Sequence, residues 1–466
     1  MTIHEAKINI ILLIYFFIFA AMKNKLAYVL CFLTLGIFIM IYVQDRTHVF
    51  KFKKLNGVYY EPKDAKLTLY NLKHGWFQQN LEENIRYNFG FREALIPFYN
   101  QYIWDFYHQS SNSTVKVGKD DWLFGWDDVA NYYQGAKYLS DDKKKATKSQ
   151  LDLEASRMYK VQQILDEYHI FIFVSLLPSK AFVFPEYLPE NPDPERETFH
   201  AIDYYPHVFD SLGVNYINVE KIFEEWKGKV DYPLFPKTGM HWSHIAAEYA
   251  FDTIMHYIED AFGMPLLHYH IGEKYTDEPR YPDTDLEAIL NLMRPIRPNT
   301  NYYADVEVVP DTRAAFPTLL VIGDSFFWNI SGSVPLGYLF RKYQYWYYNS
   351  TVYFNEQYQH TDQVDILDEI LHSRIINLMY SPRQLYIFSD DFLPKALLYL
   401  THEDREIDST LHALALSLEG DSDKEKMQAA QDSLFSSPEN FFPDLAQNGV
   451  PTTRNSRIQA ILSNPH

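Results

Sequence analysis

A serine that follows a short apolar run is the residue best placed for chemistry in this sequence. Ser325 closes the triplet Gly-Asp-Ser directly after the apolar segment 319–322. The run predicts a buried strand and the amphipathic segment behind it predicts a helix. Ser325 is therefore expected at the carboxyl edge of a sheet, where α/β proteins place their sites. A helix-capping serine has the same surroundings, so the triplet needs support from a second group.

A histidine upstream supplies that second group. His241 lies in the loop 238–243, of sequence TGMHWS, just before a helical pattern that starts near Ile245. An imidazole beside a serine can accept the hydroxyl proton and later return it to a leaving group. Ser325 as nucleophile and His241 as general base are the predicted catalytic pair, and acyl-ester chemistry is the predicted reaction.

Two polar residues near other predicted strand ends are candidates for binding groups. Asn349 follows the aromatic run 343–348 and is a candidate oxyanion donor beside the backbone N–H of Ser325, although an asparagine there is also a common turn residue. Lys180 follows the apolar run 169–177 and is a candidate for binding an anionic sugar or supporting the site. A solvent-exposed lysine is the alternative.

No metal and no other cofactor is predicted. His241 and His244 are three residues apart and Glu248 follows them, but the sequence has no HExxH pattern. The one cysteine, Cys31, lies inside an apolar run. Neither a disulfide nor a cysteine-based metal site can therefore form within the chain.

Strands that alternate with helices must position these residues. Continuous apolar runs at 169–177, 214–219 and 319–322 predict buried strands, and helical spacing at 140–168 and 245–258 predicts helices between them. This alternation predicts an α/β fold with a doubly wound parallel sheet and peripheral helices. Further predicted elements are a pair of helices in 76–107, a hairpin in 114–124 and additional strands in 343–354 and 375–388.

The N-terminal region predicts a membrane anchor. Residues 26–43 carry no charge and are long enough to span a membrane, and Lys23 and Lys25 precede them. The positive-inside rule then places everything after Gln44 outside the cytoplasm. The apolar run 10–22 is too short for a comfortable span. Because the segment from Met22 resembles a complete signal-anchor start, we interpret residues 1–21 as an extension before the true start.

Four parts of the chain are predicted. They are a membrane anchor at 1–45, a stalk with a helical and hairpin lead-in at 46–145, a catalytic domain at 146–400 and a polar helical tail at 401–466. The net charge of −19 excludes nucleic acid as a partner, because a phosphate backbone needs clustered cations. The 17% of aromatic residues mostly serve core packing, with a sugar-binding cleft as a further use.

The pairing of the His-Trp-Ser loop with a later Gly-Asp-Ser-Phe motif resembles the SGNH-hydrolase-like domain of alginate O-acetylation proteins of the AlgX and AlgJ type. Segments 88–93, 117–124 and 177–185 resemble further motifs of that family in the same order, and the likeness covers about 76–390. It implies an extracytoplasmic enzyme that forms an acetyl-serine at Ser325, with His241 as base, and passes the acetyl group to an exopolysaccharide hydroxyl. A polytopic membrane-bound O-acyltransferase is the implied donor partner.

One position departs from the family pattern. The family usually has Asp two residues before the histidine, and Gly239 stands there instead. Such an aspartate holds the imidazole tautomer and stabilises the imidazolium, so its loss costs orders of magnitude in rate. Three explanations remain open: a Ser-His dyad oriented by a backbone carbonyl, a carboxylate from elsewhere such as Asp390 or Asp391, or a protein that binds glycan without catalysis.

Polysaccharide O-acetyl transfer is the predicted function. A carbohydrate acetyl-esterase with the same Ser325 and His241 is the alternative among enzymes, since only the acceptor, sugar or water, separates the two. A catalytically silent, glycan-binding scaffold of a polysaccharide modification or export complex is the alternative from another class, and Gly239 favours it.

Overall fold

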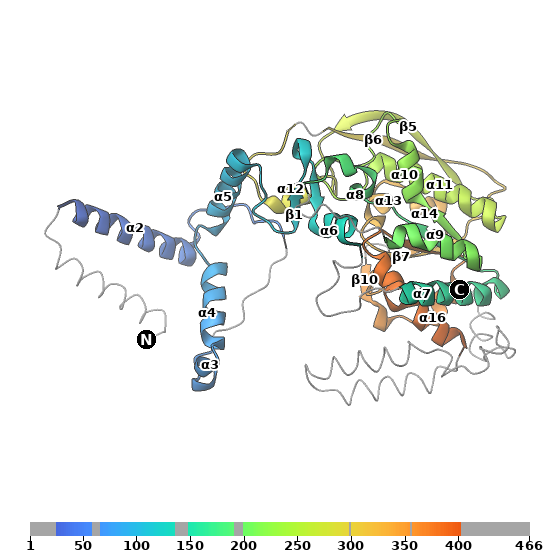
Figure 1. Ribbon diagram of the computed structural model, residues 1–466, viewed down its shortest axis with the longest axis horizontal. Helices are drawn as coiled ribbons and strands as arrows, with labels where there is room; N and C mark the ends of the chain where they lie inside the picture. The colour runs from blue at the N-terminus through green and yellow to red at the C-terminus, as the bar shows by residue number, and fades with distance from the viewer. Residues whose placement is uncertain are drawn as a thin grey trace. The chain divides into compact units, whose positions relative to one another are not determined.

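The computed structural model describes residues 25–57, 66–135, 148–190, 199–297, 300–354 and 357–401 (Figure 1). The chain divides into two compact units, Met1–Asn112 with Ala288–Pro295, and Ser113–Glu287 with Ile296–His466. The extension 1–21, the apolar run 10–22 and nearly all of the tail 401–466 lie outside the described residues. The four predicted parts of the chain stay predictions.

The first unit contains a long apolar helix and the two predicted helices that follow it. Helix α2 (Lys25–Thr47) is long and apolar enough over Ala27–Thr47 to cross a membrane, and its large side chains, such as Leu33, are exposed. A signal sequence has the same length and composition. The pair predicted in 76–107 is confirmed as α4 (Trp76–Tyr87) and α5 (Arg92–Tyr107), preceded by α3 (Leu69–Lys73).

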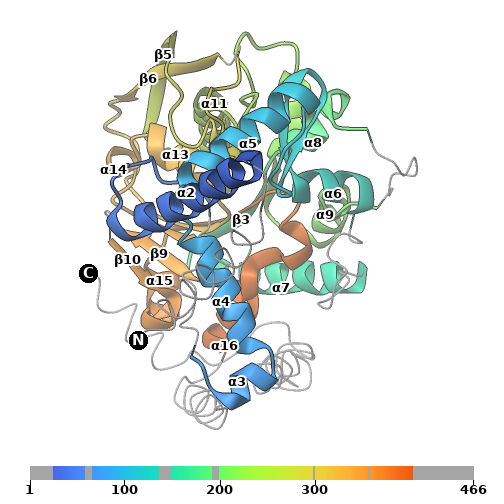
Figure 2. The ribbon, with the colours of Figure 1, turned by 90° about the vertical axis from the view of Figure 1, so that its left-hand side faces the viewer.

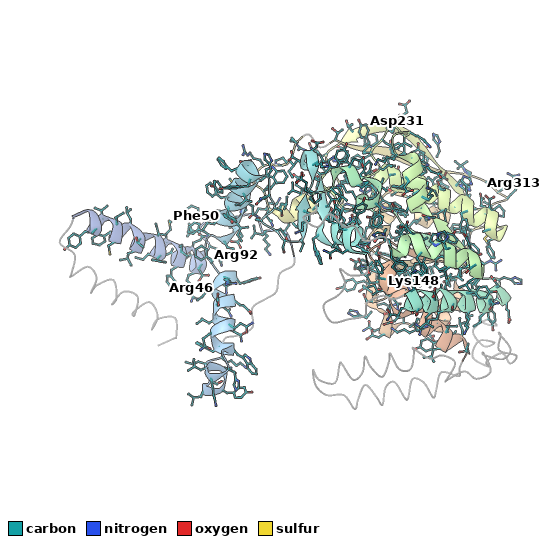
Figure 3. The ribbon with its side chains drawn as sticks, viewed as in Figure 1. Arg46, Phe50, Arg92, Lys148, Asp231 and Arg313 are labelled. Carbon is teal, nitrogen blue, oxygen red and sulfur yellow. The ribbon has the colours of Figure 1, made fainter. Side chains whose placement is uncertain are left out.

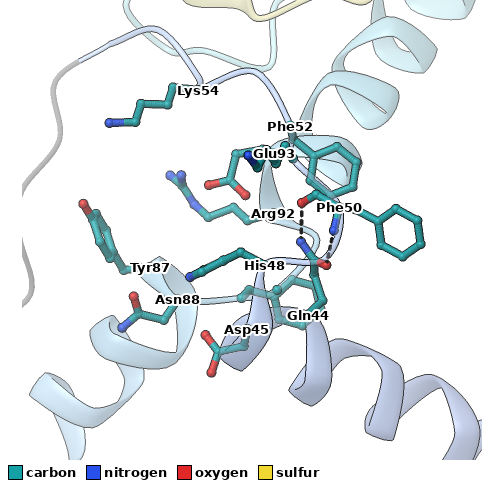
Figure 4. A pocket seen from close by; sticks show the side chains of 13 residues that line it. Gln44, Asp45, His48, Phe50, Phe52, Lys54, Tyr87, Asn88, Arg92 and Glu93 are labelled. Atoms are coloured by element: carbon teal, nitrogen blue, oxygen red, sulfur yellow. Dashed lines mark hydrogen bonds between the residues drawn. The ribbon is translucent and has the colours of Figure 1, made fainter.

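A cavity of about 670 Å³ in the same unit lies where the chain leaves α2 (Figure 4). The Gln44 side chain donates a hydrogen bond to the carbonyl of Phe50 (2.7 Å) and accepts one from its N–H (2.9 Å). Both signs of charge line the cavity, with Lys51 and Arg92 opposite in charge to Glu93. The two hydrogen bonds fix the direction of the chain after α2.

The second unit is built on a seven-stranded sheet of order β10-β9-β8-β7-β11-β3-β4. The five strands from β8 to β4 are parallel, which confirms the predicted α/β class, while β9 and β10 form an antiparallel edge. The strand bounds are β3 (Phe171–Leu176), β4 (Tyr216–Asn218), β7 (Thr318–Gly323), β8 (Lys342–Tyr347), β9 (Thr351–Phe354), β10 (Gln357–His360) and β11 (Ile375–Tyr380).

The antiparallel edge has a local cause. The aromatic run 343–354 forms two strands, because Tyr348 and Asn349 adopt positive φ values of 47° and 45° and reverse the chain between β8 and β9. The sheet is therefore mixed. Only the five strands from β8 to β4 have the parallel arrangement that the apolar runs predict.

Helices cover both faces of the sheet. Alternate side chains of β7 divide between two cores: Leu320 and Ile322 enter one, and Leu319 and Val321 enter the other. The first core is closed by α7 (Lys148–Glu167), α9 (Ala201–Leu212), α15 (Ile366–His372) and α16 (Phe392–Thr401), and the second by α10 (Val219–Trp226), α11 (His244–Phe262), α13 (Phe327–Ser333) and α14 (Leu336–Leu339). Figures 1 and 2 both show α7 and α16 on the side opposite α11 and α13.

Smaller elements complete this unit. The predicted hairpin is confirmed as β1 (Val115–Val117) and β2 (Leu123–Gly125). A long antiparallel pair, β5 (His268–Asp277) and β6 (Asn301–Val309), was not predicted. The residues of β5 are mostly polar and exposed, so this strand gives no apolar run in the sequence. Short helices are α6 (Trp126–Gln134), α8 (Lys180–Val183) and α12 (Asp285–Leu290), of which only residues 285–287 belong to this unit. Asp231 and Arg313 lie at the outer surface (Figure 3).

Candidate active site

Ser325 lies in the turn between β7 and α13, at the carboxyl edge of the parallel strands. The turn begins with Gly323, whose backbone passes so close to β11 that an added Cβ would lie 2.1 Å from the carbonyl oxygen of Met379. Glycine is therefore required where the chain leaves the strand. This close approach sets the point at which the serine emerges from the sheet.

Asp324, the middle residue of the triplet, stabilises the turn, and its side chain does not hydrogen-bond to His241. Its Oδ2 accepts hydrogen bonds from the N–H (2.8 Å) and the hydroxyl (2.5 Å) of Ser381, and its Oδ1 accepts one from the Phe326 N–H (3.1 Å). The side chain is fully buried. These bonds tie the end of β7 to the residue that follows β11.

His241 lies beside Ser325, with 2.7 Å between its Nε2 and the serine Oγ. The loop that carries His241 is fastened to the serine turn, because the Trp242 indole donates to the Phe326 carbonyl (3.0 Å). Ser243 caps α11 by accepting a hydrogen bond from the Ala246 N–H (3.2 Å). The structure thus brings together the two residues that the sequence pairs.

The carboxylate behind the histidine belongs to Asp285, the first residue of α12. Its Oδ2 lies 2.7 Å from His241 Nδ1, and its Oδ1 accepts hydrogen bonds from the N–H groups of Met240 (2.8 Å) and Leu286 (2.7 Å). With a proton on Nδ1 directed at Asp285, Nε2 is left to accept the proton of Ser325. The three side chains form a continuous Ser-His-Asp relay.

Asp285 replaces all the expected orienting groups. The expectation of Asp390 or Asp391 is wrong, and so is that of a backbone carbonyl, because the carboxylate beside Nδ1 comes from another loop. Gly239 shows why the usual place is closed to a side chain: an added Cβ there would lie 2.4 Å from the carbonyl oxygen of Asp283. The loop that delivers Asp285 fills the space where the family's aspartate would begin.

The Asp390 side chain is partly buried, and the ring nitrogens of His241 contact other residues. Burial raises the pKa of its carboxyl to about 7, with a hydrogen bond from Tyr380 opposing the shift and the charges of Asp324 and Asp391 adding to it. Its backbone carbonyl accepts a hydrogen bond from the Asn349 amide (2.9 Å). Asp390 is a structural carboxyl group and does not orient the histidine.

Asn349 is not placed as an oxyanion donor, because its Nδ2 is used by Asp390. Its neighbour Tyr348 reaches the nucleophile instead. Burial raises the pKa of the Tyr348 hydroxyl, and a hydrogen bond with the Ser325 side chain opposes that rise. The Tyr348 N–H donates to the Gly323 carbonyl (2.9 Å), which fixes the tyrosine above the serine turn. A tyrosine in a run of aromatic residues gives no sign of this role in the sequence.

Lys180 is neither exposed nor available to a sugar, so those two expectations are wrong, whereas its contacts agree with the expectation that it supports the site. It is 1% exposed, and its Nζ lies 2.7–2.9 Å from four carbonyl oxygens, those of Leu123, Pro236, Lys237 and Gly239. Burial lowers the pKa of the amine to about 7, while the charges of Asp285 and Asp128 oppose the shift. The lysine shapes the loop that carries His241.

His244 and Glu248, weighed as metal ligands, serve other contacts. His244 Nε2 lies 3.1 Å from the Tyr281 carbonyl oxygen, and burial lowers the pKa of its imidazole. Burial also raises the pKa of the Glu248 carboxyl to about 8. Both residues are buried on α11, and the contact of His244 with Tyr281 anchors the loop that leads to Asp285.

Residues 115–329 match the family model described as the SGNH hydrolase-like domain, acetyltransferase AlgX. The family resemblance is confirmed for this segment. The matched range contains Ser325, His241 and Asp285. Comparison with curated proteins gave no match.

Several solved structures are similar to this chain. The O-acetyltransferase domain of Pseudomonas putida AlgJ has a TM-score of 0.39 and 16% identity, with 60% of this chain and 98% of that chain covered. AlgX of Pseudomonas aeruginosa has a TM-score of 0.38 and 13% identity, with 60% and 66% covered. Bacillus cereus PatB1 has a TM-score of 0.36 and 14% identity, with 59% and 97% covered.

Proposed function

We propose that this chain is an O-acetyltransferase that modifies a polysaccharide through an acetyl-Ser325 intermediate. The observation that carries the proposal is the hydrogen-bonded relay from Ser325 through His241 to Asp285, inside a segment that matches an acetyltransferase family. The relay removes the reason for favouring a silent scaffold, since a carboxylate does stand behind the histidine.

The first half-reaction loads the enzyme. Ser325 Oγ attacks the acetyl carbonyl carbon while its proton passes to His241 Nε2, and the negative charge that develops on the carbonyl oxygen needs donors. The Ser325 N–H makes no backbone hydrogen bond with another described residue and is one proposed donor, and the Tyr348 hydroxyl, beside the Ser325 side chain, is the other. Collapse of the tetrahedral intermediate expels the donor's leaving group, which takes the proton from His241.

The second half-reaction delivers the acetyl group. A sugar hydroxyl gives its proton to His241 and attacks the acetyl-serine carbonyl, and Ser325 leaves with the proton restored. Asp285 stabilises the imidazolium in both halves. If water takes the place of the sugar, the same residues give an acetyl-esterase.

The setting of the site belongs to the same proposal. We place the reaction outside the cytoplasm, with α2 as the anchor, because its apolar stretch is long enough to span and lysines precede it in the sequence. A membrane-bound O-acyltransferase that brings acetyl groups across the membrane is the proposed donor partner.

A chromogenic acetyl ester tests the chemistry. We expect the full-length protein in detergent micelles to hydrolyse it slowly, and Ser325→Ala to lose that activity, because the serine is the attacking atom. Trapping the acetyl group on a Ser325 peptide by mass spectrometry would show the intermediate directly. An inactive wild-type protein that still binds glycan would overturn the enzyme proposal in favour of a scaffold.

Transfer and hydrolysis are separated by adding an acceptor. In the presence of polysaccharide, a transferase moves acetyl groups to sugar and releases less free acetate per ester consumed. Unchanged acetate release over a range of polysaccharide concentrations would identify an esterase. Ser325→Ala is the control for acetylation that does not use the site.

A further inference from the structure

A second group of histidines and carboxylates lies on the outer part of α11. Asp252, His256 and Glu259 follow one another at spacings of four and three residues, so they share one face of the helix. His268, the first residue of β5, faces them from the next element. None of these residues takes part in the relay at Ser325.

The four side chains contact one another in a closed arrangement. His268 Nδ1 lies 3.2 Å from Asp252 Oδ1, and His268 Nε2 lies 2.9 Å from Glu259 Oε2. His256 Nδ1 lies 3.2 Å from the same Glu259 oxygen, and its Nε2 lies 3.7 Å from Asp252 Oδ2. Each carboxylate therefore faces both imidazoles, whose ring centroids are 4.3 Å apart.

The geometry of this group suits a shared cation. Carboxylate oxygens and imidazole nitrogens converge on one place, and the two rings lie face to face at 4.3 Å. Nε2 of His268 is also buried and makes no aligned hydrogen bond, despite its nearness to Glu259.

We propose that Asp252, His256 and His268 bind one divalent transition metal ion of the Zn²⁺ type. One ligand atom from each of the three lies within 4.8 Å of the others, and imidazole with carboxylate is a ligand set that suits zinc. Glu259 completes or supports the set, because the Leu266 N–H donates to its other oxygen (2.8 Å) and holds it in place. His256, 59% exposed, leaves a path for the ion.

The proposed ion would join the two segments that deliver the relay. Helix α11 begins directly after the loop of His241, and β5 leads into the loop of Asp285. A metal bridge between α11 and the start of β5 would hold these segments together without contacting the reacting atoms. Its expected effect is on stability, in proportion to the affinity of the folded state for the ion.

Metal binding can be measured on the full-length protein in detergent after treatment with a chelator. We expect titration with Zn²⁺ alone to give one bound ion per chain and to raise the melting temperature, and Co²⁺ to give visible absorption bands of a low-coordinate site. His256→Asn should weaken Zn²⁺ binding about 100-fold or more, beyond the loss typical of removing a supporting group. Because His256 is exposed, we expect the His256→Asn variant to fold like the wild-type protein.

A matched histidine provides the control. His372 also lies beside an aspartate, Asp368, at 3.3 Å, and among the described residues it is not one of the three that could hold a metal ion together. His372→Asn should leave Zn²⁺ binding unchanged, and so should Ser325→Ala. Equal binding by His256→Asn and wild type would overturn the proposal. So would a melting temperature that changes with pH but not with Zn²⁺, which would assign the cluster to protons.

Discussion

The relay at Ser325 and the Asp252 cluster use the same side-chain types in different surroundings. At the relay one imidazole stands between one hydroxyl and one carboxylate, and the His241 side chain is only 5% exposed. At the cluster two imidazoles and two carboxylates all face one another, and His256 is 59% exposed. The direction of hydrogen bonds and the exclusion of water, more than residue type, separate a proton relay from a cation site.

Replacing Asp285 should lower the turnover more than any of the other substitutions that probe this comparison. Asp285→Asn keeps the shape but removes the charge and lets the imidazole adopt the wrong tautomer, so kcat should fall about 10²- to 10⁴-fold with little change in KM. Ester hydrolysis across a range of pH measures it. Asp311→Asn, at an exposed ion pair, is the control. If the kcat of Asp390→Asn fell by this amount while Asp285→Asn kept the wild-type kcat, the assignment of Asp285 would be wrong.

Gly239 tests whether the geometry of the relay depends on the neighbouring backbone. Gly239→Ala would place a Cβ 2.4 Å from the Asp283 carbonyl oxygen and push Asp285 away from His241. We expect up to about a 100-fold loss of kcat, the cost of an error of about 1 Å at a reacting group. Gly337→Ala is the matched control, since nothing lies within 4 Å of its added Cβ. Equal rates for the two variants would contradict the steric account.

Asp390 is a carboxyl group whose pKa is raised by burial but which does not orient the histidine, so its replacement should change stability and not turnover. Its folded-state pKa of about 7 exceeds the usual value of 3.8, so the folded chain binds the extra proton. The free energy of unfolding should therefore fall as pH rises from about 4 to about 7 and then level off. Asp390→Asn lacks this loss and should exceed wild type in stability by about 1–3 kcal/mol at pH 8.

Denaturant unfolding at pH 5 and pH 8 measures the difference. The gain of Asp390→Asn over wild type should be larger at pH 8 than at pH 5. Glu307→Gln, on the exposed part of β6, serves as the control for removing one negative charge from the chain. A gain that is the same at both pH values would contradict the raised pKa.

His256 should give the smallest effect on turnover. Because the cluster does not touch the reacting atoms, His256→Asn should keep ester hydrolysis within about twofold of wild type at a temperature well below unfolding. The same preparation serves for the Zn²⁺ titration. A large loss of kcat without loss of stability would show that the cluster takes part in the reaction and would end the contrast between the two regions.

The sequence predicted the parts of the fold that have strong periodicity. The apolar runs became β3, β4 and β7, and the TGMHWS loop and the Gly-Asp-Ser triplet brought His241 to Ser325. The third member of the relay could not be predicted from the sequence. Asp285 lies 44 residues after His241, beyond the mostly polar β5, and an aspartate at the start of a helix is common. Proximity of that kind is created only by the tertiary fold.

Lys180 and Tyr348 were misjudged or missed for related reasons. A lysine after a strand is usually solvated, whereas the Nζ of Lys180 is buried among four carbonyl groups that come from other segments of the chain. The contact of Tyr348 with Ser325 was missed because a run of aromatic residues does not show that the chain turns at Tyr348 with a positive φ.

The antiparallel pair β5–β6 gives the proposed active site a second structural requirement besides the sheet. Ser325 follows β7 and His241 lies just before α11, whereas Asp285 lies in the segment that connects β5 to β6 and accepts a hydrogen bond from the Met240 N–H. Grafting the two motifs onto another scaffold would therefore yield a dyad. A single proteolytic cut in the antiparallel pair would silence the site while the sheet stayed whole.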